Sequence, residues 1–114
     1  MQQSSVSTLV LQTVPEFRGR FEEFVDCLPH KPGMGSVMAE FGAFVGDIST
    51  REPYPYELVT RCLDMLEELL GQVDESDRIE IGASFFGDMP VGVITASLLW
   101  MGPRTLSALE SLDD

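Results

Sequence analysis

The sequence has few basic residues: seven lysines and arginines stand against nineteen aspartates and glutamates among its 114 residues, for a net charge of −12. A surface this acidic repels the phosphates of nucleic acids and of anionic membranes, so we expect neither as a partner. The two cysteines, Cys27 and Cys62, are too few for a disulfide framework, and His30 is the single histidine. With no indication of export, we expect reduced thiols and a cytoplasmic protein.

The sequence also lacks a basic leader and a long hydrophobic run. Its first ten residues contain no lysine or arginine and no extended apolar segment, so we expect no signal peptide. The uncharged stretch at residues 89–103 is interrupted by Pro90 and Gly92 and is shorter than the roughly 20 residues that cross a bilayer. We therefore expect no membrane partner.

The chain does contain enough apolar side chains for a folded domain. Hydrophobic residues make up 44% of it and include seven phenylalanines, whereas charged residues make up 23%. This composition is typical of globular proteins and unlike that of disordered ones. We therefore expect a single domain over residues 1–114.

Apolar residues recur at helical spacing along most of the chain, which favours an all-α fold. The expected helices are a short one at about residues 5–12, one opened by a capping box at Thr13-Val-Pro-Glu16, one capped by Ser36, one from Pro55 to a C-cap at Gly71, one capped by Asp74, one over Val91–Met101 and one opened by Gly102-Pro103. We expect a compact domain of six or seven short helices in antiparallel hairpins.

Two of these helices have little polar surface. The helix after Asp74 carries Ile79 and Phe86 with only a narrow polar strip, so we expect it to be largely buried. The uncharged segment Val91–Met101 is expected to form a central helix, although its start could form a strand, since periodicity does not separate the two in short apolar runs. In the last helix, Leu106, Leu109 and Leu112 are expected to face inward.

Negative charge is concentrated between residues 64 and 80, where seven acidic residues accompany one basic residue, Arg78. Such a field attracts a cationic partner and speeds its arrival, although a charged arc is also the ordinary surface of a solvated helix. The turn after Gly71 favours a partner, because its carboxylates have no basic neighbours to neutralise them. The candidate binding residues are Asp64, Glu67, Glu68, Asp74, Glu75, Asp77 and Glu80.

Two further surfaces are candidates for contact. Tyr54 and Tyr56 lie in a proline-rich loop, and tyrosine is enriched at interface hot spots. The alternative is that one of them, Tyr56 at the helix start, packs back onto the domain; Trp100 is expected in the core. A face of small residues could pair two copies of the chain or serve an adaptor, and it consists of Ala39, Gly42, Ala43 and Gly46.

Cys27 and His30 form the one pair whose spacing hints at chemistry. A Cys-x-x-His pair can supply two zinc ligands, but structural zinc needs four, and Cys62 would serve only if the fold brought it near. The pair could also act as a thiol nucleophile and its base. We favour a structural interpretation, in which Cys27 ends a helix as a small hydrophobic residue and His30 bonds to a backbone carbonyl in a turn.

No other pattern predicts catalysis. Asp64, Glu67 and Glu68 lie on an exposed helical arc, whereas carboxylate catalysis needs two such groups across a pocket. The sequence contains no glycine-rich phosphate loop after a strand and no Gly-x-Ser-x-Gly motif. We therefore expect no enzyme, no cofactor and no metal.

The order of several short motifs resembles a family of small, acidic, all-helical bacterial proteins of unknown function. These motifs are Val14-Pro-Glu-Phe17, Leu28-Pro-His30, the segment Cys62–Leu70 with its acidic turn, the segment Ile79–Phe86, and Met101-Gly-Pro-Arg104. Some members of that family resemble immunity proteins encoded beside secreted toxins. The resemblance implies a helical cytoplasmic protein, and it carries over no catalytic residues to this chain. After His30, residues 31–35 replace an apolar run that is usual in the family.

Charge and resemblance together predict an immunity-type inhibitor. Its acidic residues from Asp64 to Glu80, with Tyr54 and Tyr56, are expected to cover the basic cleft of a cognate toxin domain. Inhibition by occlusion needs no chemistry from this chain. The alternative is a non-enzymatic adaptor, or a domain that forms a homodimer, without a toxin partner.

Overall fold

The computed structural model describes residues 3–112, and within that range it contains only helices. The elements are α1 (Gln3–Thr13), the 3-10 helix η1 (Pro15–Phe17), α2 (Arg18–Asp26), α3 (Met34–Ile48), α4 (Tyr56–Gln72), α5 (Glu75–Phe86), α6 (Val91–Ser97), the 3-10 helix η2 (Leu98–Trp100) and α7 (Pro103–Ser111). The all-α prediction is confirmed, and the start of the uncharged segment is helical rather than a strand.

The apolar faces of α3 and α4 supply most of the core. On α3, six apolar residues at helical spacing are all buried: Val37, Met38, Phe41, Phe44, Val45 and Ile48. On α4, seven apolar residues between Val59 and Leu70 are buried on one side. Phenylalanine rings join α3 to its neighbours. The ring centroid of Phe41 lies 5.2 Å from that of Phe17 in η1 and 5.9 Å from that of Phe85 in α5. These ring separations are typical of favourable aromatic contacts.

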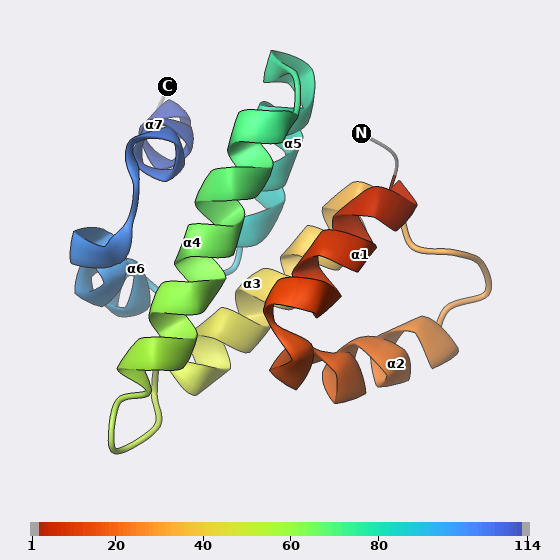
Figure 1. Cartoon of the computed structure of the whole chain (residues 1–114), viewed down its shortest axis with the longest axis horizontal. Helices are drawn as coiled ribbons and strands as arrows, with labels where there is room; N and C mark the ends of the chain where they lie inside the picture. Colours follow the sequence, from red (N-terminus) through yellow and green to blue (C-terminus); the bar gives the residue numbers. More distant parts are fainter. Residues whose placement is uncertain (1–2, 113–114) are drawn as a thin grey trace.

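Helices that follow one another in sequence do not make the closest pairs. After its tight turn, α5 packs mainly against α3, while α4 lies between α1 and α7 (Figure 1). The α3–α5 crossing is close because Gly42 has no side chain: a Cβ there would overlap the carbonyl oxygen of Phe85. One side of α4, which carries Asp64 and Glu68, is therefore left uncovered between its two flanking helices. We call this side the outer arc of α4.

Several helix ends differ from the predicted caps. Asp74 caps α5 as predicted, because its carboxylate accepts a hydrogen bond of 2.9 Å from the backbone N–H of Asp77. The capping box at Thr13-Val-Pro-Glu16 is wrong: Thr13 still belongs to α1, and η1 follows Val14 without a side-chain cap. The Ser36 cap is also wrong, since α3 already begins at Met34. The helix predicted to end at Gly71 continues to Gln72.

Three predictions of burial are wrong for the C-terminal third. Ile79 of α5 is 61% exposed, and Leu112 after α7 is 42% exposed. The uncharged segment does not form a central helix, because α6 is short and lies at the edge of the molecule (Figure 1). Its continuation η2 leaves Leu99 89% exposed. An apolar composition without charge therefore marks a surface segment here, not the core.

The Gly42 contact makes a matched pair of substitutions informative. Gly42→Ala is expected to lower the free energy of unfolding by about 2–3 kcal/mol, because the new methyl group forces α3 and α5 apart. Gly46→Ala in the same helix meets no atom within 4 Å and is expected to raise stability by up to about 1 kcal/mol through helix propensity. Urea unfolding followed by circular dichroism measures both; equal effects would contradict the close crossing.

Candidate functional site

Arg61 lies at one edge of the outer arc of α4. Its guanidinium donates two hydrogen bonds to the carboxylate of Glu16, at 2.6 and 2.8 Å, and two to Glu57, at 3.0 and 2.7 Å. These bonds lower the pKa of both carboxyl groups and raise that of Arg61. Glu16, predicted to cap a helix, thus ties the start of η1 to α4 instead.

The opposite edge of the arc is fixed by Glu67, whose side chain is only 18% exposed. Its carboxylate accepts hydrogen bonds from the backbone N–H of Arg104 at 3.1 Å and from the N–H and hydroxyl of Thr105 at 2.9 and 3.0 Å. These donors form the first turn of α7, whose N-cap residue, Gly102, has no side chain to block the approach. Glu67 therefore caps α7 from another helix and is not available as a contact residue.

The pKa of Glu67 reports this role. Burial alone raises it, but the hydrogen bonds from Thr105 and Arg104 outweigh burial, and the net pKa lies below its ordinary value of 4.5. A carboxyl group whose pKa falls on folding stabilises the fold above its unfolded pKa. That contribution is lost as the pH falls below 4.5 and through the lower folded value.

The other predicted acidic residues do not form one continuous patch. Asp64 and Glu68 are exposed on the outer arc, one helical turn apart, and Glu68 accepts a 3.3 Å hydrogen bond from Gln72. Asp74 and Glu75 are exposed at the turn into α5, and Asp77 is partly buried there. Glu80 lies beside the first turn of α3, since a Cβ on Gly35 would be 3.2 Å from its carboxylate oxygen.

Two arginines, Arg104 and Arg78, stand near this acidic region, and the bonds found for them are to Glu67 and to the backbone of Leu70. The guanidinium of Arg104 lies over Gly71 and 3.5 Å from Glu67. Arg78 donates a 2.8 Å hydrogen bond from Nε to the carbonyl oxygen of Leu70 at the end of α4. On the outer arc itself, no basic side chain within the described residues lies within 4 Å of Asp64 or Glu68.

An aromatic row continues the arc at the N-terminal end of α4. The ring of Tyr56 is 4.8 Å from that of Tyr54 and 5.8 Å from that of Trp100, both in edge-on geometry. Tyr56 is 60% exposed, whereas Tyr54 is partly buried and packs against the core with its hydroxyl oxygen buried. The inward tyrosine is therefore Tyr54, contrary to the prediction, and Trp100 is only partly in the core.

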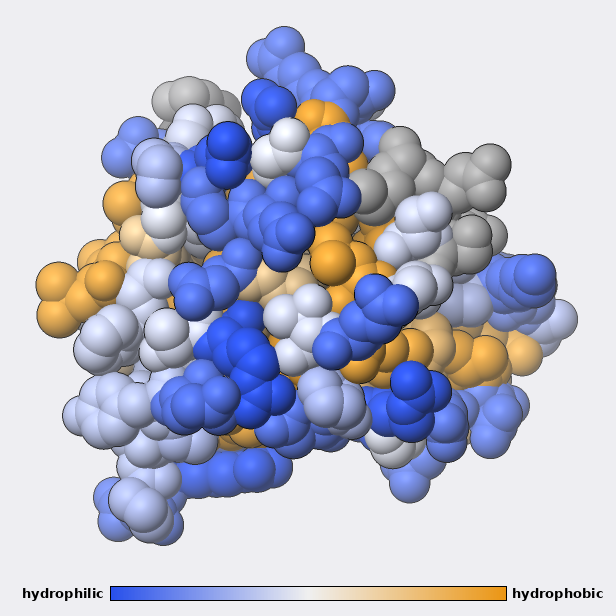
Figure 2. Space-filling model, viewed as in Figure 1, coloured by the Kyte–Doolittle hydropathy of each residue, from blue (hydrophilic) through white to orange (hydrophobic). Residues whose placement is uncertain are grey.

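Sequence reasoning missed the part of η2 that joins this row. Leu98 and Leu99 are exposed next to Trp100, and hydrophobic surface lies over this edge of the molecule (Figure 2). The signal was the run of four large apolar residues, from Leu98 to Met101, directly before Gly102-Pro103, where a short turn cannot bury all of them. We call Tyr56, Leu98, Leu99 and Trp100 the apolar end of the outer arc.

The small-residue face of α3 is not a free surface. Gly42 is buried against α5, so its role is filled within the chain, while Ala39 and Ala43 are exposed and Gly46 is partly buried. The predicted homodimer contact thus loses its central member. A copy of the chain cannot approach the backbone at Gly42 while α5 covers it.

The structure places Cys27 and His30 at the surface, after α2. The Nδ1 atom of His30 lies 3.0 Å from the carbonyl oxygen of Lys31, as the structural interpretation expects. Cys27 is exposed rather than packed, and Cys62 is buried in α4, where burial raises the pKa of its thiol to about 12. Within residues 3–112, no three histidine, cysteine or acidic side chains are grouped so that they could hold a metal ion.

Among the described helices, none is by itself long and apolar enough to cross a membrane; α5 with the α6–η2 segment reaches that length only as a pair bent by 116°. No protein-family model, curated protein or solved structure matches this chain.

The cap on α7 can be tested with adjacent glutamates. Glu67→Gln is expected to lower the free energy of unfolding by about 1–2 kcal/mol at pH 7, because the N-terminus of α7 loses its carboxylate. Glu68→Gln, one residue away and exposed, should change it by less than about 0.5 kcal/mol.

The same pair predicts a pH dependence. The stability difference between wild type and Glu67→Gln should shrink as the pH falls below 4.5, where the wild-type carboxylate becomes protonated. Denaturant unfolding of wild type and Glu67→Gln at pH 7, 5 and 3.5 measures this difference, and Glu68→Gln is the control at each pH. A difference that stays constant with pH would show that the charge of Glu67 contributes nothing.

Proposed function

We propose that this chain is a cytoplasmic, non-enzymatic binding protein that inhibits a cationic partner by covering it. The observation that carries the proposal is the outer arc of α4, which joins the uncompensated carboxylates Asp64 and Glu68 to an exposed apolar end around Tyr56. The partner class follows from the resemblance: a basic toxin domain, with this chain as its immunity protein.

The charges support attraction and orientation of such a partner. The two carboxylates lie between edges that are already internally paired, by Arg61 on one side and by Glu67 on the other. Asp74 and Glu75 extend the exposed negative charge to the turn. An acidic surface of this kind raises the association rate of a basic protein and suppresses wrong partners more than it adds affinity.

The apolar end supports affinity. Tyr56 and Trp100 are rigid aromatic side chains held edge to face, so little conformational entropy is lost when they are buried in a complex. Exposed Leu99 adds apolar surface next to them. Tyrosine and tryptophan dominate interface hot spots, particularly when surrounded by polar groups that exclude water.

Inhibition by this surface requires only that the outer arc is bound over the active cleft of the partner. A partner that acts on anionic substrates has a basic cleft. Carboxylates bound in that cleft compete with the anionic groups of the substrate for the same basic side chains. The chain would then need no nucleophile, acid–base pair or metal. This mechanism also places the binding residues on a helix, which holds them more rigidly than a loop does.

The charge part of the proposal predicts a location-specific effect. The partner is first identified by capture from native lysate at low salt and release at about 0.5 M, where screening is strong. The double variant Asp64→Lys, Glu68→Lys is then expected to associate about tenfold more slowly, with its helical content unchanged. Glu23→Lys, Asp26→Lys on α2 makes the same change in net charge at exposed residues elsewhere.

Stopped-flow or surface-based kinetics on the three proteins gives the answer. Equal slowing by both double variants would mean that only net charge matters, and an unchanged rate for the α4 variant would remove the outer arc from the interface.

The apolar end predicts the complementary kinetic signature. Tyr56→Ala is expected to accelerate dissociation by about tenfold or more, as for an interface hot spot, with little change in association. Because Tyr56 is 60% exposed, the free protein should remain folded, which a thermal melt checks. Dissociation at the wild-type rate would show that the partner does not reach this end of α4.

A further inference from the structure

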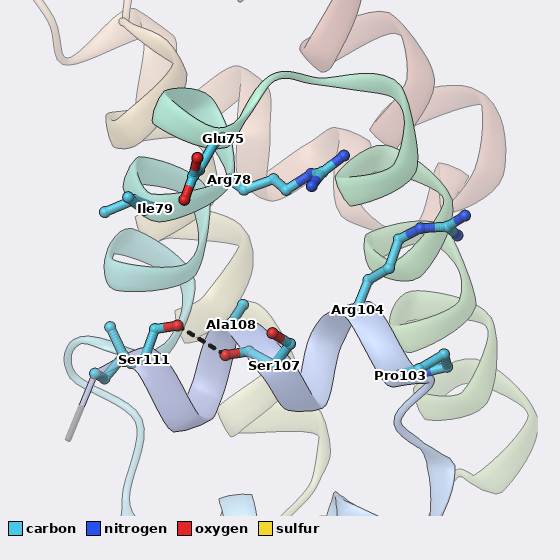
Figure 3. A pocket seen from close by; sticks show the side chains of 9 residues that line it. Glu75, Arg78, Ile79, Pro103, Arg104, Ser107, Ala108 and Ser111 are labelled. Atoms are coloured by element: carbon cyan, nitrogen blue, oxygen red, sulfur yellow. Dashed lines mark hydrogen bonds between the residues drawn. The ribbon is translucent and has the colours of Figure 1, made fainter. Parts of the chain in front are cut away.

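A groove lies between α5 and α7. Its volume is about 670 Å³, within the range of ligand-binding pockets. All the residues that line it come from α5, from α7 and from position 112. The helices touch where Gly82 meets Ala108 and diverge from there, which leaves the groove open along its outer side (Figure 3).

The walls of the groove are apolar at one side. Ile79 of α5 is 61% exposed and Leu112 is 42% exposed, and Ala108 lies on α7 between the two helices. Apolar side chains on both walls of a groove are left in water unless another molecule covers them. The serines Ser107 and Ser111 add small side chains on α7 that allow a close approach.

The other side of the groove carries two arginine side chains, in a chain with a net charge of −12. The side chains of Arg78 and Arg104 extend in the same direction, towards the end of α4 (Figure 3). Within residues 3–112, Arg78 has no carboxylate within 4 Å, and Arg104 has only Glu67 at 3.5 Å. Glu75 also lines the groove, but in Figure 3 its side chain points away from the two guanidinium groups.

We propose that this groove binds an acidic, apolar peptide segment of a partner protein, with its apolar side chains against Ile79 and Leu112 and a carboxylate at Arg78 and Arg104. Guanidinium groups bind carboxylates with directed, charge-assisted hydrogen bonds. Arg104 already pairs with Glu67 at 3.5 Å, whereas Arg78 has no carboxylate within 4 Å among the described residues, so Arg78 is the main positive charge open to a ligand carboxylate.

The occupant is a peptide rather than a free small acid because the groove has only two walls. A binding pocket normally covers most of the surface of a small ligand. A small acid here would leave its outer side in water, whereas a segment of a partner protein is covered on that side by the rest of the partner. This segment is independent of the cationic surface proposed to contact α4.

Three blocked heptapeptides test the proposal on the full chain: LAELLAE, its neutral counterpart LAQLLAQ and its cationic counterpart LAKLLAK. Amide chemical shifts of the 15N-labelled protein are followed up to about 5 mM peptide, a range that detects millimolar affinity. We expect LAELLAE to shift residues of α5 and α7 and to bind about tenfold more tightly there than LAQLLAQ. General electrostatics predicts the reverse order for a protein of this charge, so the order is diagnostic.

Two variants and a control locate the effect. Arg78→Gln, Arg104→Gln should remove the preference for LAELLAE, and Ile79→Ser, at an exposed position, should weaken LAELLAE and LAQLLAQ alike. Arg51→Gln, in the exposed loop before α4, removes a positive charge elsewhere and should change nothing. The proposal is overturned if no shifts appear in the groove, if LAELLAE binds no better than LAQLLAQ, or if Arg51→Gln matches the double variant.

Discussion

The close crossing of α3 and α5 at Gly42 determines how the other helices are arranged. Because the backbone of Phe85 occupies the space where a side chain would stand, α5 is held on α3 and cannot lie along α4, which precedes it in the chain. α4 is covered instead by α1 and α7, helices from the two ends of the sequence. Its outer arc and the open groove between α5 and α7 both follow from this arrangement.

The acidic residues divide between stabilising the fold and facing solvent. Glu67 replaces a missing cap on α7, and Glu16 ties η1 to Arg61. Both carboxylates are therefore already engaged in hydrogen bonds within the chain. Asp64 and Glu68 have no such role and remain on the surface. The net charge of the chain therefore overstates the negative charge that is available to a partner. The position of a carboxylate in the fold decides whether it stabilises the fold or faces solvent.

The helices and the buried faces of α3 and α4 could be predicted from the sequence, because periodicity is a local property. The role of Glu67 could not, since its donors lie 37 and 38 residues away in sequence. Trp100 and Leu99 were misplaced because a short uncharged segment has no polar face to indicate which side is outward. The α5–α7 groove depends on how two distant helices diverge, and no sequence pattern carries that information.

The central claim is that a cationic partner binds the outer arc of α4, and carboxylate footprinting tests it most directly. Carbodiimide coupling of an amine to the exposed acidic side chains is measured by mass spectrometry for the free protein and for its complex with the captured basic partner. The account predicts that Asp64 and Glu68 become protected in the complex, while Glu23 and Asp26 on α2 stay as reactive as in the free chain. Protection of α2 with an unchanged α4 would contradict it.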